Sequence, residues 1–142
     1  MILLKERKSG GIRLSELAIG SIVTAFYKTG KYIGEITEIR PQSYLVRVLA
    51  VLKHPMQGDL HQPKEAIVDI FHERKALSYR EQMNAPKKMV KLYKEDSIPS
   101  YNDSLQTAIE KMRKELQEDD SAFAIQSLKN LEILNAEYYK IV

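Results

Sequence analysis

The chain contains no cysteine among its 142 residues. This absence excludes disulfide bonds, thiolate metal ligands and thiol nucleophiles, and it is typical of proteins that fold in a reducing compartment. Long hydrophobic runs are also missing, since no segment approaches the roughly 20 apolar residues of a membrane span. The N-terminal apolar block, residues 2–4, is too short for a signal peptide. We therefore expect neither covalent cross-links nor a membrane span nor a lipid anchor.

Charge of one sign does not dominate either, because the formal net charge is only +3. It is unevenly spread: residues 1–99 hold 17 Lys+Arg against 11 Asp+Glu, whereas residues 100–142 hold 5 against 8. This asymmetry favours two structural units and is too weak to indicate nucleic-acid binding by itself. A hydrophobic content of 44% with 29% charged residues is typical of a globular protein with a buried core.

The first two thirds of the chain have the composition and spacing of short β-strands. Gly34, inside one of these segments, predicts a bulge or a close approach of two backbones. A long loop is expected at residues 53–66, and a short helix within residues 72–82 that ends at residues 83–86. The expected strands are residues 21–27, 31–39, 44–52, 67–71 and 88–93. About five strands with short connections predict a small SH3-like or OB-like β-barrel.

After a linker at residues 96–100 the hydrophobic period changes from two to 3.6. Asn102 or Asp103 can cap a first helix, and Ser121 can cap a second. The expected apolar stripes are Leu105, Ala108, Ile109, Met112 and Leu116, then Ile125, Leu128, Leu131, Leu134, Tyr138 and Ile141. The predicted fold is therefore α+β: an N-terminal arm (residues 1–17), an SH3-like barrel (18–95) and a C-terminal α-helical hairpin (96–142).

All three histidines lie in or beside the long loop, at His54, His61 and His72. With Asp59 they could ligate zinc or iron and serve a metal-dependent enzyme. Their spacing matches no compact metal signature, and no catalytic constellation or phosphate-binding glycine loop is visible. We therefore expect no catalytic residue, metal or cofactor, and we interpret the histidines as groups that fasten the loop by hydrogen bonds.

Basic and aromatic residues interleave in residues 26–32, and Arg40, Tyr44 and Arg47 follow nearby. On a small barrel this pattern could bind nucleic acid by stacking and phosphate contacts, or an extended peptide in an aromatic groove. The plainer alternative is that about half of the tyrosines belong to the core, with their hydroxyls at its edge. Between the two kinds of partner, we favour a protein over nucleic acid.

Three segments resemble kinase-associated protein B of sporulating bacilli: YKTGKYIGEI (27–36), VRVLAVLKHPMQGDLHQP (46–63) and FHERKALSYREQ (71–82). Two later segments, PSYNDSLQTAIEKMRKEL (99–116) and SLKNLEILNAEYY (127–139), are similar as well. The resemblance covers about residues 18–140. It implies an SH3-like barrel followed by a helical region, and it brings no established catalytic or ligand residues.

The resemblance also implies a function, that of an accessory factor for a membrane sensor histidine kinase in the sporulation phosphorelay. The hypothesis is a non-enzymatic, cytoplasmic interaction protein without a small-molecule substrate, whose membrane proximity comes through the kinase. A nucleic-acid-binding barrel and a metal-dependent enzyme are the alternatives. The family is sometimes labelled lipoprotein, and this chain departs from that label because it has no cysteine to lipidate. The candidate partner-binding residues are Tyr27, Tyr32, Tyr44, Lys53, His54, His61, His72, Arg74 and Tyr79.

Overall fold

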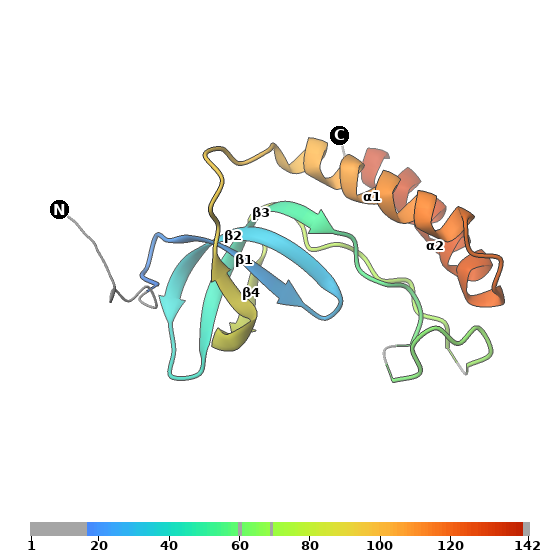
Figure 1. Cartoon of the computed structure of the whole chain (residues 1–142), viewed down its shortest axis with the longest axis horizontal. Coiled ribbons are helices and arrows are strands. Elements are labelled where there is room, and N and C mark those ends of the chain that lie inside the picture. Colours follow the sequence, from blue (N-terminus) through green and yellow to red (C-terminus); the bar gives the residue numbers. More distant parts are fainter. Residues whose placement is uncertain (1–16, 60, 69, 141–142) are drawn as a thin grey trace.

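The computed structural model describes residues 17–59, 61–68 and 70–140. A curled antiparallel sheet forms one end of the molecule, and two helices lie diagonally beside it (Figure 1). The elements in chain order are β1 (Ile22–Tyr27), β2 (Gly30–Ile39), β3 (Ser43–Lys53), β4 (Gln82–Pro86), the 3₁₀ helix η1 (Lys87–Met89), β5 (Val90–Leu92), α1 (Tyr101–Gln117) and α2 (Ala122–Lys140).

The five strands form one sheet in the order β4-β3-β2-β1-β5. Its two edge strands, β4 and β5, are joined in sequence by η1 alone. Because three residues span only about 10 Å, the sheet has to curl until its edges approach one another. In the described part of the chain these edges do not pair, so the sheet is an open curl rather than a closed barrel. The predicted α+β class, with a five-stranded sheet before a helical hairpin, is confirmed.

Gly34 marks a place where β2 and β3 approach closely. The register shifts between Ile33 and Gly34, and a Cβ added at Gly34 would lie 2.5 Å from the carbonyl oxygen of Arg47 and from Cγ1 of Val46. Real Cβ atoms do not come this close to backbone, so only glycine fits. The bulge and close approach predicted for Gly34 are confirmed.

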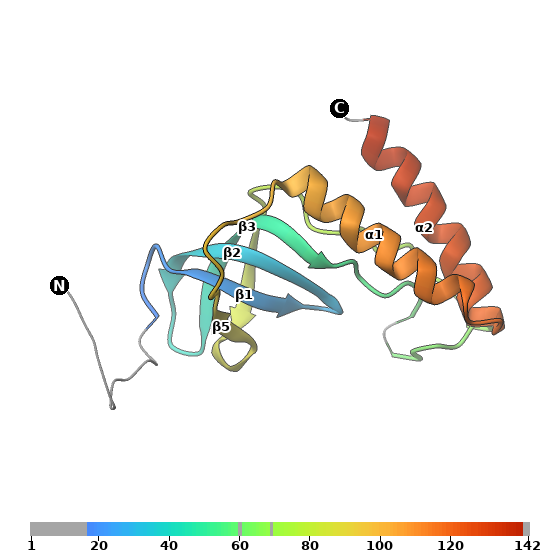
Figure 2. The same ribbon diagram turned by 45° about the horizontal axis from the view of Figure 1, so that its top comes forward.

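One hydrophobic cluster joins the sheet to both helices. Val46 and Val48 of β3 are fully buried in it, together with Ile109 of α1 and Leu131 of α2. Burying such aliphatic side chains stabilises the fold by about 1.5–3 kcal/mol each. Figure 2 shows α1 lying across the end of β3, with α2 on the far side of α1. None of the helices in the described segments is long and apolar enough to cross a membrane.

The structure corrects the expected fourth strand. Residues 67–68 and 70–71 form no strand, residue 69 lies outside the described residues, and Ile67 and Ile70 are 93% and 59% exposed. The fourth strand is β4, where Met83 and Ala85 are buried and alternate with exposed neighbours. Residues 72–78 form no helix, residues 79–80 form a turn, and the expected strand at 88–93 is the shorter β5 preceded by η1. The apolar content of residues 67–71 was misleading because that segment lies outside the core.

The helix ends and faces agree in part with the sequence. Ser100, rather than Asn102 or Asp103, caps α1 by accepting a hydrogen bond from the N–H of Asp103 (3.1 Å). Ser121 caps α2 as predicted, accepting from the N–H of Ala124 (3.1 Å). The stripe of α1 is correct, but that of α2 begins at Phe123 and Ala124, and Ile125 is exposed. The expected arm lies outside the described residues except for Leu17, and so does Ile141.

Replacing Gly34 with alanine should lower the free energy of unfolding by about 2 kcal/mol or more, because the new methyl group overlaps β3. Urea denaturation would measure the loss. Glu38→Ala, at the exposed end of the same strand, is the control and should change stability by less than about 0.5 kcal/mol. Equal stability of Gly34→Ala and the parent chain would show that β2 and β3 can separate freely here.

Candidate functional site

After β3 the chain makes a long excursion and returns to β4 through an extended segment. We call residues 72–81 the strap. The strap runs back beneath the helices toward β4 in both views (Figures 1 and 2). Residues 72–78 of it belong to neither a helix nor a strand, so other groups have to satisfy its buried backbone.

Three tyrosine hydroxyls, from three different elements, bind the middle of the strap. Tyr32 of β2 accepts a hydrogen bond from the N–H of Leu77 (3.2 Å), and Tyr101 of α1 donates one to the carbonyl of Leu77. Tyr138 of α2 accepts one from the N–H of Ala76 (2.9 Å). The hydroxyls therefore fix the strap against the sheet and both helices, as a neighbouring strand would do with its backbone.

His54 completes this arrangement from the fully buried end of the loop. Its Nδ1 lies 3.1 Å from the carbonyl oxygen of Pro55, which can only accept, so Nδ1 carries the proton. In the neutral ring Nε2 is then an acceptor, and the hydroxyl of Tyr138 donates to it across 2.8 Å. Burial lowers the pKa of His54 to about 4, against the opposing effect of the bond to Pro55. The ring is thus neutral near pH 7.

The tyrosine hydroxyls are protonated over the same range. Burial raises the pKa of Tyr32 to about 12 and that of Tyr138 to about 12, and it also raises the pKa of Tyr101. Removing a proton from Tyr101 or Tyr138 would also place a charge beside the carbonyl oxygen of Leu77 or the ring of His54. These hydroxyls therefore act as neutral donors and acceptors, and their arrangement is structural rather than that of an acid–base pair.

Gln57 fastens the base of the excursion. Its side chain is buried, accepts from the N–H of Arg74 (2.8 Å) and donates to the carbonyls of Arg74 (2.9 Å) and Pro55 (3.0 Å). Arg74 Nε donates in turn to the carbonyl of Gly58 (2.9 Å). Gly58 has φ +100°, and a Cβ there would lie 3.0 Å from the ring of Phe71. The two arms of the loop are therefore closed onto each other.

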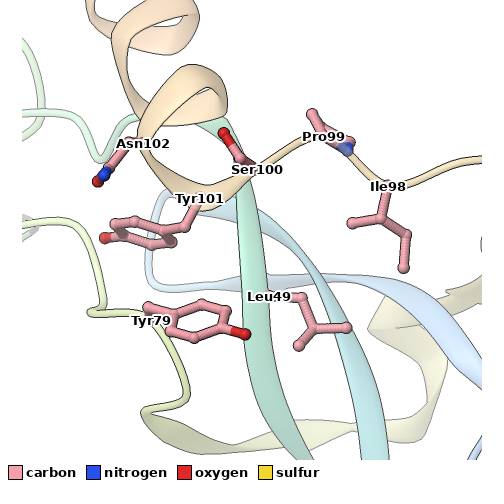
Figure 3. Close-up of a pocket in the computed structure, with 7 residues that line it drawn as sticks. All are labelled: Leu49, Tyr79, Ile98, Pro99, Ser100, Tyr101 and Asn102. Atoms are coloured by element: carbon pink, nitrogen blue, oxygen red, sulfur yellow. The ribbon is translucent and has the colours of Figure 1, made fainter.

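A groove of about 500 Å³ opens where the strap meets the start of α1 (Figure 3). We call it the tyrosine groove. The rings of Tyr79 and Tyr101 lie 6.0 Å apart at its wall, with Leu49 and Ile98 beside them. Its lining is Leu49, Tyr79, Ile98, Pro99, Ser100, Tyr101 and Asn102. This lining carries no charge, and exposed Tyr79, with exposed Ile98 in the same lining, is the kind of side chain that forms the centre of protein interfaces.

The candidate partner-binding residues do not all lie on one surface. Tyr32, Tyr44 and His54 are at most 8% exposed, so the structure removes them from any partner surface in this conformation. Tyr27 and Arg74 are half-buried and line a neighbouring hollow of about 320 Å³. The exposed candidates are Lys53, His61, His72 and Tyr79. Among all nine candidates, Tyr79 alone lines the tyrosine groove.

The loop-fastening hypothesis for the histidines holds for the ring of His54. His61 contributes its backbone N–H, which donates to Asp59 (2.8 Å), and His72 contributes its carbonyl oxygen, which accepts from Gly58 (2.9 Å). The rings of His61 and His72 are in exposed residues. Within residues 17–59, 61–68 and 70–140, no group of three or more His, Asp or Glu residues could hold a metal ion.

Several groups that shape the site carry no signal in the sequence. Tyr101 follows directly after the predicted linker, and Ile98 and Pro99 belong to that linker. The sequence predicts no role for any of the three. Tyr138 was expected in the apolar stripe, which agrees with its half-buried ring, but no pattern connects its hydroxyl to Ala76. Hydrogen bonds between residues 62 or 84 positions apart cannot be inferred from local spacing.

The model of the family described as Kinase associated protein B matches residues 27–139, which include the strap, the tyrosine groove and His54. The chain belongs to this family. The resemblance seen in the sequence is thereby confirmed, and the match covers both the sheet and the helical hairpin.

This chain matches two relatives over nearly their whole length. Kinase-associated lipoprotein B of Bacillus subtilis (strain 168) is 58% identical over 126 residues, which are 89% of this chain and 98% of that protein. The X-ray crystal structure of kinase-associated protein B from Bacillus cereus is 52% identical and has a TM-score of 0.76. The match covers 87% of this chain and 99% of that one. The fold described above is therefore that of the family.

Tyr138→Phe should lower the free energy of unfolding by about 2–3 kcal/mol, because it leaves the buried N–H of Ala76 and Nε2 of His54 without a partner. Tyr139→Phe removes the same atom from the exposed neighbouring residue and should change stability by less than about 0.5 kcal/mol. Urea denaturation of both variants measures the difference. Equal losses, or none in Tyr138→Phe, would contradict the role of this hydroxyl.

His54 should make the fold sensitive to acid. Its pKa is about 4 when folded and about 6.5 when unfolded, so the unfolded chain gains a proton first as the pH falls. The stability that neutral His54 contributes is complete above pH 6.5 and is lost progressively toward pH 4, by about 3 kcal/mol.

His54→Gln should therefore show a smaller loss of stability between pH 7 and pH 4 than the parent chain, measured by denaturation at both values. His61→Gln is the matched control, because His61 is exposed, and it should keep the parent profile. Identical profiles for all three proteins would mean that His54 titrates normally in the folded state.

Proposed function

We propose that this protein is a non-enzymatic accessory factor that binds a sensor histidine kinase in the cytoplasm and supports its output in the sporulation phosphorelay. The observation that carries the proposal is membership of the kinase-associated protein B family, with a relative matched over 98% of its length. A shared fold over this length makes a shared partner class the simplest expectation. Membrane proximity then follows from the kinase.

The chemistry of the site supports binding rather than catalysis. The groups whose pKa burial changes strongly, His54 and the three strap-binding tyrosines, use their polar atoms on one another or on backbone. A general base or nucleophile needs a free atom facing a substrate. The tyrosine groove instead offers an uncharged aromatic and aliphatic lining suited to the apolar side chains of a partner protein.

The nucleic-acid alternative receives less support from the placement of the basic residues. Arg40 donates to Glu38 (3.0 Å), and Arg47 lies 3.9 Å from Glu35, so both guanidinium groups have acidic neighbours. Lys28 and Lys31 lie over the rings of Tyr27 and Phe26, at 5.5 and 5.2 Å, where a base would stack. The four cations do not form one stacking surface, and protein binding remains the favoured function.

The proposal predicts that the tagged chain captures a sensor histidine kinase from sporulating cells after in-cell crosslinking. Deletion of the gene for this protein should lower kinase-dependent sporulation. Tyr79→Ala should weaken binding to the captured kinase at least about tenfold, since a buried interface aromatic contributes about 2 kcal/mol. Ile125→Ala, an exposed apolar residue of α2 away from the groove, is the control.

Both variants should keep the parent's melting temperature, because both side chains are more than half exposed. Normal sporulation without the protein, with no kinase captured, would contradict the proposed function. Capture of a kinase with equal affinity by Tyr79→Ala would contradict the assignment of the tyrosine groove alone.

A further inference from the structure

Two lysines face each other across neighbouring strands close to the β1–β2 turn. Lys31 of β2 is the register partner of Lys53 of β3, and on its other side it pairs with Phe26 of β1. Like charges directly opposite in a sheet are destabilising. In the described segments no carboxylate lies within ion-pair distance of either ammonium group. The cross-strand pairing of two lysines is therefore a local conflict within the fold, and such conflicts are characteristic of functional positions.

Exposed apolar residues accompany the two lysines, one in contact with an ammonium group and one next in sequence. Phe26 is 40% exposed and has Nζ of Lys31 5.2 Å from its ring centroid, and Leu52 is 38% exposed beside Lys53. We call Phe26, Lys31, Leu52 and Lys53 the lysine patch. Ammonium groups on an apolar base bind carboxylates better than fully hydrated ones, because less water surrounds the contact.

The lysine patch is continuous with the tyrosine groove. Leu52 lines a second hollow, of about 220 Å³, together with Pro99 and Thr107. Pro99 also lines the tyrosine groove. The tyrosine groove, the second hollow and the lysine patch therefore form one path, which leads from Tyr79 through Pro99 and Leu52 to the lysine pair.

Charge changes along this path. The tyrosine groove has no charged residue, the second hollow has one acid, Asp103 in the first turn of α1, and the far end has Lys31 and Lys53. A complementary ligand is apolar at the groove and acidic beyond Leu52, past the carboxylate of Asp103. A polyanion such as nucleic acid would find no partner for its phosphates in the uncharged groove, and a flat anionic bilayer cannot enter it.

We propose that this path binds an extended segment of a partner protein, with apolar side chains in the tyrosine groove and carboxylates on Lys31 and Lys53. The inference deepens the proposed function and rests on it, since it names the chemistry of the kinase segment that would bind. The acidic end gives orientation and speeds association, while the apolar end supplies most of the affinity.

The charge-reversed variant Lys31→Glu/Lys53→Glu tests the acidic end. Its affinity for the captured kinase should fall roughly tenfold or more, and the parent's affinity should decrease with added salt while that of the variant does not. Lys111→Glu/Lys129→Glu makes the same change of net charge on exposed positions of the helices and should bind like the parent. Equal losses in both variants, or no loss in the first, would overturn the proposal.

The melting temperatures of the parent and of the lysine variants are measured in parallel. Lys53→Glu alone should melt no lower than the parent, because it replaces a like-charged cross-strand pair by an opposite one. It should still weaken kinase binding. A lower melting temperature would mean that Lys53 serves the fold, and it would overturn the assignment.

A second arm separates this inference from the proposed function. A labelled polyglutamate peptide, phosphatidylglycerol vesicles and single-stranded DNA are each titrated against the parent and Lys31→Glu/Lys53→Glu. Weak binding of polyglutamate that the variant loses supports carboxylate recognition, even if no kinase is captured and the proposed function fails. Binding of vesicles or DNA without binding of polyglutamate would overturn it in favour of a lipid or nucleic-acid ligand.

Discussion

The hydroxyl of Tyr138 joins three parts of the molecule that share no secondary structure. It accepts from the strap at Ala76 and donates to His54 at the end of β3, while its ring packs against the core from α2. An extended segment without a partner strand leaves its backbone groups unsatisfied, and burying them costs more free energy than most side-chain contacts return. The tyrosines of β2, α1 and α2 remove this cost, and the sheet and helices are held to the strap as a result.

This constraint explains what could and could not be predicted. The positions of β1, β2, β3 and both helices followed from periodicity and glycine placement, because each is determined by its own sequence. The bulge at Gly34 was predictable for the same reason, because it depends on the local sequence of β2. β4 was missed although Met83 and Ala85 alternate with polar neighbours, since the more apolar residues 67–71 masked it. Local apolar content identified a strand that tertiary structure does not use, as the exposure of Ile67 demonstrates.

The candidate site was predictable only in outline. The histidine-rich stretch does hold the loop, through the ring of His54 and the backbones of His61 and His72. Its chemistry depends on groups far away in sequence, such as Tyr101 and Asn130, which reach the strap from the helices. The groove beside Tyr79 forms because the chain between β5 and α1 places Ile98 next to Leu49. No rule based on residue spacing predicts this contact. Lys53 and Tyr79 could be proposed from the sequence, because basic and aromatic residues are common at binding surfaces.

The separation of the partners of Tyr138 along the chain has a consequence for the order of folding. Its hydrogen bonds span 62 and 84 residues, whereas the β1–β2 and β2–β3 pairings close loops of a few residues. Long loops cost more entropy to close and are closed later, so strands β1, β2 and β3 should pair before α2 docks on the strap. The amide of Ala76 is then protected from solvent exchange only when the whole chain is in place, which makes one backbone proton a reporter of the finished fold.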